Sequence, residues 1–269
     1  MKRISTAHRI YFFAVCSFGL FVGGMGYLAP ELISWAVPLT PPPLHARTVA
    51  SLYLAGGTMM LLAGLAQDAR QVRLPTVVAT IWTGSLGIVT LLYLDQFDTA
   101  LRSTWFWFFA YSVYPVAGVY FILRFRRGPT SGERAPLPRM NRVLLGVLGA
   151  FALAVSLLLL FLPGVMVNVW PWKLSLMLAQ IYGGPLMGLA VIALLMTTAD
   201  KEECFISAVG ISMFPVLALA ASLMHLNLFA PWAVSSVIWF SCLGIASLAG
   251  AFVLMGIAAR KDSSRKGKQ

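Results

Sequence analysis

Histidine and cysteine, the side chains that could bind a metal or haem, are scarce and widely separated in this sequence. There are three histidines, His8, His45 and His225, and three cysteines without a CxxC pair. A haem-binding four-helix unit would place histidines opposite one another within apolar helices, whereas His45 and His225 border apolar runs. We therefore expect no metal or cofactor. A metal or haem site that joins His45 and His225 with Asp95 or Asp98 remains the open alternative.

Catalytic patterns are also missing from the sequence. We find no Ser-His-Asp set, HExxH motif, glycine-rich phosphate loop or paired carboxylates. None of the nine acidic or twenty basic residues lies in the middle of a long apolar run, and an ion-driven pump normally carries a buried carboxylate. The sequence thus predicts no catalytic residues, no enzyme and no ion-coupled transporter, although passive conduction stays open.

The composition is typical of a membrane protein. The chain is 11% charged and 59% hydrophobic with a mean hydropathy of +0.82, whereas a soluble domain is about a quarter charged. The apolar residues form runs near 20 residues, the length of a helix that crosses a bilayer. We predict an all-α polytopic protein with eight transmembrane helices. The runs cover residues 10–28, 49–66, 76–94, 104–123, 143–162, 178–196, 205–224 and 235–257.

The basic residues predict the orientation of these helices. Seventeen of the twenty fall in segments on one side if the termini are cytoplasmic, and only Arg47, Arg102 and Lys173 fall on the other. Cytoplasmic loops carry such an excess, so we predict cytoplasmic N- and C-termini in a bacterial cytoplasmic membrane. The net charge of +11 then faces anionic lipids at the cytoplasmic surface. No nucleic-acid partner is needed to explain it.

The two halves of the sequence resemble each other at a spacing of 132 to 133 residues. Trp107 and Gly118 recur as Trp239 and Gly250 with the same internal spacing. A unit with an even number of helices repeats in the same orientation, so this pattern predicts two parallel four-helix repeats; chance similarity of apolar segments is the alternative. The predicted parts are residues 1–124 and 143–258 for the repeats, 125–142 for a basic cytoplasmic linker and 259–269 for a basic tail. Ala46-Arg47 in the first repeat corresponds to Ala179-Gln180 in the second.

Small residues at helical spacing predict where helices come close. Gly19 and Gly23 form one such pair, and Gly184 and Gly188 form another. Membrane helices approach closely at such positions. We expect these contacts to lie within the chain rather than between two copies.

Tryptophan is concentrated on one side of the predicted topology. Seven of the eight tryptophans fall in the outer loops or the outer third of a span, which interfacial anchoring alone could explain. The sharper hypothesis is that the Trp- and Pro-rich stretches 35–40 and 170–175 are interfacial or re-entrant elements around an outward-facing pocket. The candidate residues of this site are Trp35, Arg47, Asp95, Trp170, Trp172, Gln180 and Asn227.

The second Trp-rich stretch resembles a pattern of known type. Residues 170–175, Trp-Pro-Trp-Lys-Leu-Ser, with Ala179-Gln180 after them, resemble the W-P-W-x-L-T-P-L-T-A-R pattern of uncharacterised bacterial multi-pass membrane proteins. Residues 38–41 and Ala46-Arg47 keep its Pro-Leu-Thr and Ala-Arg ends, while Gln180 replaces the terminal Arg. Residues 95–98, Asp-Gln-Phe-Asp, before a Trp-rich span are also similar. The resemblance implies the same repeat and topology and brings no function with it.

Two functions compete on these observations. The first is a non-enzymatic integral membrane protein that serves as a structural, accessory or assembly component of a membrane complex, with other membrane-protein subunits as partners. The alternative is an uncoupled permease, or a lipid- or small-molecule-binding protein with an outward-facing pocket between the repeats. A third, an intramembrane enzyme or haem carrier, lacks the residues that it would require.

Overall fold

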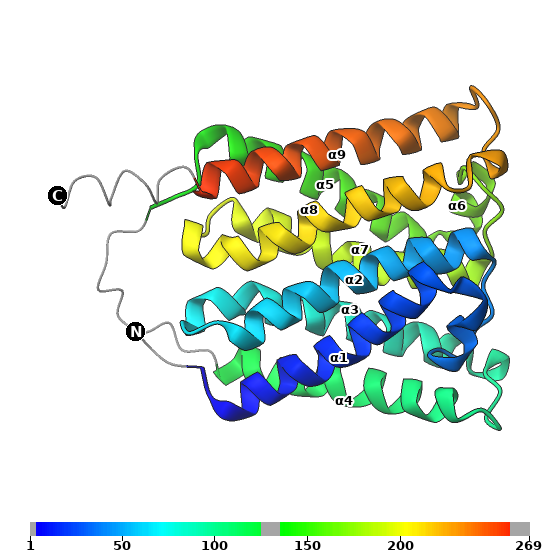
Figure 1. Ribbon diagram of the computed structural model, residues 1–269, viewed down its shortest axis with the longest axis horizontal. Coiled ribbons are helices and arrows are strands. Elements are labelled where there is room, and N and C mark those ends of the chain that lie inside the picture. The colour runs from blue at the N-terminus through cyan, green and yellow to red at the C-terminus, as the bar shows by residue number, and fades with distance from the viewer. Residues whose placement is uncertain (1–3, 125–134, 259–269) are drawn as a thin grey trace.

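The computed structural model describes residues 4–124 and 135–258, which are folded mainly into helices (Figure 1). Eight of these helices are long and apolar enough to cross a membrane. Only helices of about 20 residues satisfy their own backbone across a hydrocarbon core of about 30 Å, so the chain is a multi-pass membrane protein. The eight are α1 (Thr6–Leu28), α2 (Pro43–Leu65), α3 (Arg73–Leu92), α4 (Arg102–Arg124), α5 (Arg139–Phe161), α7 (Leu176–Met196), α8 (Lys201–Leu223) and α9 (Val234–Ala258).

Short helical elements lie in the connections between the long helices. They are η1 (Pro30–Trp35), η2 (Ala69–Val72), η3 (Leu94–Gln96), α6 (Pro163–Val169) and η4 (Leu226–Leu228). The predicted spans agree closely with the long helices except at the start of α2, which begins at Pro43 rather than Val49. Proline suits the first helical position because its missing N–H has no partner there anyway. His45 therefore lies in the first turn of α2, and the prediction that it precedes this helix is wrong.

The long helices form two layers, and each layer holds two helices from either half of the sequence. In one layer α1 packs on α2, α2 on α8 and α8 on α9; in the other α4 packs on α3, α3 on α7 and α7 on α5. Figure 1 shows the first layer in front, in the order α9, α8, α2 and α1 from top to bottom. The helices α2, α3, α7 and α8 thus occupy the centre, and the two halves interlock.

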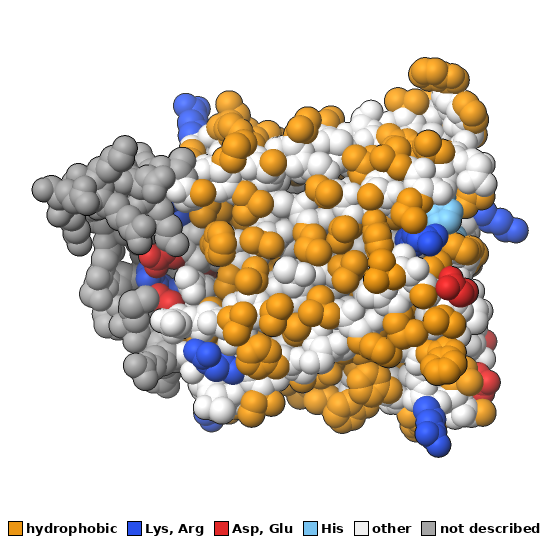
Figure 2. Space-filling view, in the orientation of Figure 1, with side chains coloured by type: hydrophobic (Ala, Val, Ile, Leu, Met, Phe, Trp, Pro, Cys, Tyr) orange, Lys and Arg blue, Asp and Glu red, His pale blue; other side chains and the backbone are white. Residues whose placement is uncertain are grey.

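The charged side chains gather at the two ends of this bundle, and hydrophobic ones cover the face between them (Figure 2). The charged end, where α1 begins and α9 ends, holds Asp68, Arg70, Arg73, Asp200, Glu202 and Glu203. We call the opposite end the tryptophan end. It holds Trp35, Trp105, Trp107, Trp170, Trp172, Trp232 and Trp239.

Ion pairs at the charged end tie the connection between α2 and α3 to the start of α8. Arg70 Nη2 lies 2.9 Å from Asp68 Oδ2 and 2.9 Å from Glu202 Oε2, and Arg73 Nη1 lies 2.7 Å from Glu203 Oε1. Burial alone would raise the pKa of Asp68, but the hydrogen bonds and charge of Arg70 outweigh it and bring the pKa below its ordinary value. Asp68 therefore stays ionised and holds Arg70 in place.

Glycines allow the helices to approach closely, as their spacing predicts. A Cβ on Gly19 would lie 3.2 Å from Gly57 Cα of α2, and a Cβ on Gly188 would lie 3.2 Å from the Val78 carbonyl oxygen of α3. Such distances leave no room for a larger side chain without movement of the neighbouring backbone. These contacts lie within the chain, as expected from the sequence.

We predict that Gly23→Ala destabilises the protein. A Cβ at Gly23 would lie 2.9 Å from the backbone nitrogen of Leu54, so α1 and α2 must separate. Overpacking of this kind costs about 1–3 kcal/mol of the free energy of unfolding, measurable as a lower Tm of the detergent-purified protein. The adjacent Gly24 is the matched control, because a Cβ there meets no heavy atom within 4 Å. Gly24→Ala should leave the Tm unchanged or slightly raised, and equal Tm values for the two variants would contradict the close packing of α1 on α2.

Candidate functional site at the tryptophan end

The two Trp- and Pro-rich stretches that we predicted as interfacial or re-entrant elements lie in the connections at this end. The first stretch begins where η1 ends, at Trp35, and the second begins at Trp170, directly after α6. Each stretch then leads into a central helix, α2 or α7. Each stretch thus lies between a short helix and a long helix whose length and apolar character suit a membrane span.

His45 joins the two halves of the sequence at this end. Its Nε2 lies 2.9 Å from the Lys173 carbonyl oxygen, and its Nδ1 lies 2.8 Å from the Tyr182 hydroxyl. A carbonyl oxygen only accepts, so Nε2 carries the proton and Nδ1 accepts from Tyr182 and, at 3.4 Å, from Trp172 Nε1. The ring is neutral and buried. Both nitrogens are therefore occupied by groups of the protein itself.

Two aromatic rings, those of Trp172 and Tyr182, contact this histidine and belong to a larger cluster. We call this cluster the aromatic plug; it consists of Trp170, Trp172, Tyr182, Phe229 and Trp239. The ring centroids of Trp172 and Trp239 are 4.9 Å apart, those of Trp170 and Trp239 5.5 Å, and those of Trp172 and Phe229 5.3 Å. These separations are typical of favourable aromatic pairs. The plug brings two of the predicted site residues, Trp170 and Trp172, into contact with the same neighbour.

Two buried polar atoms near the plug have no hydrogen-bond partner among the described residues. They are Trp170 Nε1, a donor, and Gln180 Oε1, an acceptor. Buried polar atoms are normally paired with protein or with ordered water. Trp170 and Gln180 thus each offer a buried, unpaired polar atom to a small polar molecule.

Arg47 forms a separate cluster on the outer surface of α2. Its Nε donates to the Tyr27 carbonyl oxygen at 3.1 Å, and its Nη1 donates to His225 Nε2 at 2.7 Å. Burial and the nearby charge of Arg47 both lower the pKa of His225. His225 is therefore neutral at pH 7 and can accept this hydrogen bond, which links α2 to the end of α8.

The structure separates the two histidines that the open metal alternative would combine. His45 contacts Tyr182, Trp172 and the Lys173 carbonyl, whereas His225 contacts Arg47. In the part of the chain that the structure describes, no group of three or more histidine, cysteine, aspartate or glutamate residues could hold a metal ion. The geometry thus gives this alternative no support.

The other predicted site residues lie apart from these contacts. Trp35 is 78% exposed at the end of η1, and Asp95 in η3 and Asn227 in η4 are exposed. Gln180 is buried in the second turn of α7, where its Nε2 donates to the Leu160 carbonyl oxygen at 2.7 Å. The seven residues therefore lie in several places at the tryptophan end rather than around one described cavity.

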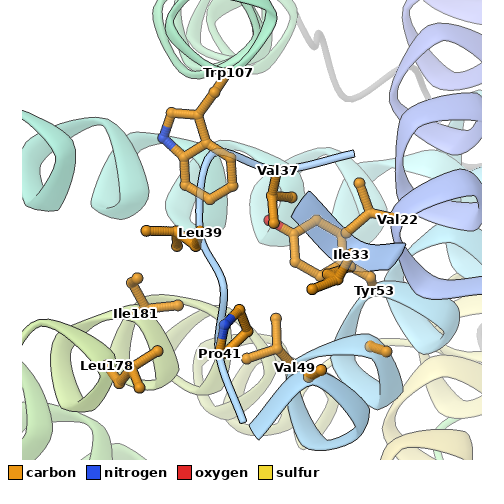
Figure 3. A pocket seen from close by; sticks show the side chains of 12 residues that line it. Val22, Ile33, Val37, Leu39, Pro41, Val49, Tyr53, Trp107, Leu178 and Ile181 are labelled. Atoms are coloured by element: carbon orange, nitrogen blue, oxygen red, sulfur yellow. The ribbon is translucent and has the colours of Figure 1, made fainter. Parts of the chain in front are cut away.

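A small cavity does lie nearby, between helices of both halves (Figure 3). Its volume is about 20 Å³ and its walls are mainly apolar, from Val22 of α1 and Trp107 of α4 to Leu178 and Ile181 of α7. A second cavity of about 40 Å³ lies in the first half between Phe18, Trp82 and Tyr111, among other residues. A water molecule needs about 10–15 Å³ by this measure. Each cavity therefore has room for a few water molecules at most, and none of the seven predicted residues lines either one.

Sequence reasoning missed Tyr27, Tyr182 and Phe229, which complete the two clusters. Tyr27 and Tyr182 carry no signal, because a tyrosine in an apolar run looks like any lipid-facing aromatic residue. Phe229 had a signal in the repeat, since Phe97 precedes it by 132 residues. Both phenylalanines are buried against a ring of the following long helix, Phe108 or Phe240.

We predict that His45→Leu destabilises the tryptophan end. Leucine fills much of the space but leaves the Tyr182 hydroxyl, the Trp172 indole N–H and the Lys173 carbonyl without their partner. A buried polar group that loses its partner costs about 1–3 kcal/mol, so the Tm in detergent should fall and tryptophan emission should shift to longer wavelength. Tyr182→Phe is the matched control, since it removes one hydroxyl and leaves His45 with Trp172 as a donor. A wild-type Tm for His45→Leu would refute the buried network.

Comparison with protein-family models, curated proteins and solved structures finds no match for this chain. The resemblance to bacterial membrane proteins with the W-P-W-x-L-T-P-L-T-A-R pattern therefore stays a prediction. A proposal about function has to rest on the geometry of the chain.

Proposed function

We propose that this chain is a non-enzymatic protein of the bacterial cytoplasmic membrane that acts as a structural, accessory or assembly component of a membrane complex. The observation that carries the proposal is the closed packing of the centre. The described cavities are small and apolar, and side-chain networks cover both ends of the central helices. A protein built this way offers its surface, rather than an internal path, to other molecules.

The outer helices provide that surface. On α4, Trp105, Phe109, Val116 and Leu123 are between 56% and 79% exposed, and α5 and α9 are the least buried spans together with α4. Lipid tails cover such faces, and so do the helices of another membrane protein, because helices associate in lipid through packing. A complex subunit would use one of these faces.

The alternative function is an uncoupled permease or a lipid- or small-molecule-binding protein. The cavity of Figure 3 favours it, because this cavity lies between helices from both halves near the tryptophan end. The unpaired Trp170 Nε1 and Gln180 Oε1 are further groups that a ligand could use. This function requires the cavity to widen, since its present volume is about 20 Å³.

We also infer that the halves are parallel repeats, because contacts recur at the sequence spacing of the repeat. Trp107 Nε1 donates to Thr90 Oγ1 at 2.8 Å, and Trp239 Nε1 donates to Ser222 Oγ at 2.9 Å. Arg47 and Gln180 each donate to a carbonyl of the preceding long helix, that of Tyr27 or Leu160. Thr80 packs against Gly118 as Ser212 packs against Gly250. These paired contacts support a pseudo-twofold axis along the membrane normal that relates one layer of helices to the other.

The predicted orientation places the charged end in the cytoplasm, and we expect reporter fusions to show this. A fluorescent protein joined after Gln269 should fluoresce, and alkaline phosphatase at the same position should be inactive, because the phosphatase needs the oxidising side. As a matched control, the same reporters inserted between the end of α4 and Ala135 should behave in the same way, because this connection is predicted to lie on the same side. Active phosphatase after Gln269 would reverse the proposed orientation.

The accessory role predicts a defined protein neighbour on an outer helix. A photo-crosslinking residue at Val147, which is 63% exposed on α5, or at Leu248, which is 75% exposed on α9, should give a discrete cross-linked product in cells. The same residue at Ile192, which is fully buried in α7, is the control and should give none.

Loss of this chain should also lower the amount of the cross-linked protein, since an assembly component stabilises its partner. Purification in mild detergent is the complementary measurement. A protein that purifies alone, cross-links only to lipid and opens a solvent-accessible cavity at mid-membrane would refute the accessory role and favour the permease.

A further inference from the structure

We propose that Arg47 and His225 form a binding site for the phosphate group of an anionic phospholipid, open to the lipid at the tryptophan end. The proposal rests on the membrane placement described above and is independent of the accessory role. Arg47 lies on the outer surface of α2, outside the closed packing of the central helices. The proposal assigns an anionic ligand to its side chain.

The charge of Arg47 has no ionic partner among the described residues. Its side chain is half-buried and no carboxylate among the described residues forms an ion pair with it. Its two hydrogen-bond partners, the Tyr27 carbonyl oxygen and His225 Nε2, are both neutral. A cation at an apolar surface is costly unless an anion or water compensates it.

The hydrogen bond from Arg47 to the Tyr27 carbonyl oxygen does not require a charged side chain. Gln180, at the corresponding place in α7, donates to the Leu160 carbonyl oxygen at 2.7 Å, as Arg47 donates to the Tyr27 carbonyl oxygen at 3.1 Å. The neutral amide thus fulfils the same packing task in the other half. The guanidinium at position 47 adds a positive charge and further N–H donors that this contact does not need.

Arg47 and His225 keep several N–H donors that their mutual hydrogen bond and the Tyr27 contact do not use. The guanidinium has five N–H groups, and the contacts with Tyr27 and His225 use one on Nε and one on Nη1. The remaining three N–H groups are on Nη1 and Nη2. Because His225 accepts at Nε2, its Nδ1 carries a proton that has no partner among the described residues. This Nδ1 lies on the side of the ring away from Arg47, so His225 orients the guanidinium through Nε2, and the free N–H groups of the guanidinium match the geometry of phosphate oxygens.

The site lies near the ends of α2 and α8, where we expect the lipid headgroups. Arg47 lies near the start of α2, about 6 Å along the helix from Pro43, and His225 follows the end of α8. Apolar, exposed residues stand next to the two partners of Arg47 in the sequence. Leu28, which follows Tyr27, is 82% exposed, and Met224, which precedes His225, is 58% exposed. Figure 2 shows a basic side chain beside a histidine toward this end, with hydrophobic side chains around them and an acidic and a further basic side chain nearby. Acyl chains would cover such a surface while the phosphate meets Arg47.

The test is native mass spectrometry of the full-length protein in detergent, titrated with phosphatidylglycerol or with phosphatidylcholine of the same acyl chains. We expect the wild type to retain phosphatidylglycerol preferentially, and Arg47→Gln to bind it at least about tenfold more weakly, because charge-assisted hydrogen bonds are lost. Gln180 shows that glutamine can make the carbonyl contact, so this variant should fold. Equal binding of phosphatidylglycerol by the wild type and Arg47→Gln would overturn the proposal.

Two further arms make the result decisive. Arg47→Lys keeps a charge but loses the guanidinium fork, so it should bind phosphatidylglycerol more weakly than the wild type. If Arg47→Gln is unstable, this variant carries the test, and wild-type binding by it would overturn the site.

Inorganic phosphate is the second arm. A rise in Tm with phosphate that depends on Arg47, without any effect of phosphatidylglycerol, would overturn the lipid as ligand and identify a free anion instead.

Discussion

The structure depends on two close crossings between the central helices. At one crossing a Cβ on Gly210 of α8 would overlap the end of the Met59 side chain of α2, and at the other a Cβ on Gly188 of α7 would lie 3.2 Å from the Val78 carbonyl oxygen of α3. Lipid tails are as apolar as the helices, so close packing rather than hydrophobic burial holds membrane helices together. Each crossing joins one half of the sequence to the other. The networks at both ends keep their geometry only while these crossings hold.

The positions of the helices could be predicted from the sequence, but their arrangement in two layers could not. The bilayer imposes a length and an apolar character on every span, and this signal is strong in all eight. The layers depend on which face of each helix is packed. In a chain whose faces are all apolar, the hydrophobic pattern does not distinguish a packed face from one that meets lipid. The glycine pairs were the exception, because small residues indicate a close contact whatever surrounds them.

The contacts of the candidate site could not be predicted from the sequence, and its location stays a prediction that rests on the concentration of tryptophan at one end. The similarity of the two halves paired Arg47 with Gln180, which make corresponding hydrogen bonds. The partners of His45 could not be found, because Tyr182 and the Lys173 carbonyl reach it from the other half. Contacts across so long a stretch of chain depend on how the layers assemble, and the sequence of either half alone contains no trace of them.

Under the proposed duplication, the contacts between the halves show what a single duplicated chain can do that two identical chains cannot. Arg70 and Glu202 are separated by the repeat spacing of 132 residues, and they form an ion pair with each other at 2.9 Å. In a symmetric dimer, a residue at the axis meets its own copy, so a charged side chain there would face a like charge. Once the two copies lie in one chain, their residues can change separately, and opposite charges can meet at the axis. The same freedom accounts for the tryptophan end. His45 and Arg47 contact the second half, whereas the corresponding residues of α7 are the apolar Leu178 and Gln180, which donates to a carbonyl within its own half. We infer that contacts within each half were retained after duplication, and that the chain acquired its distinctive chemistry where the halves meet.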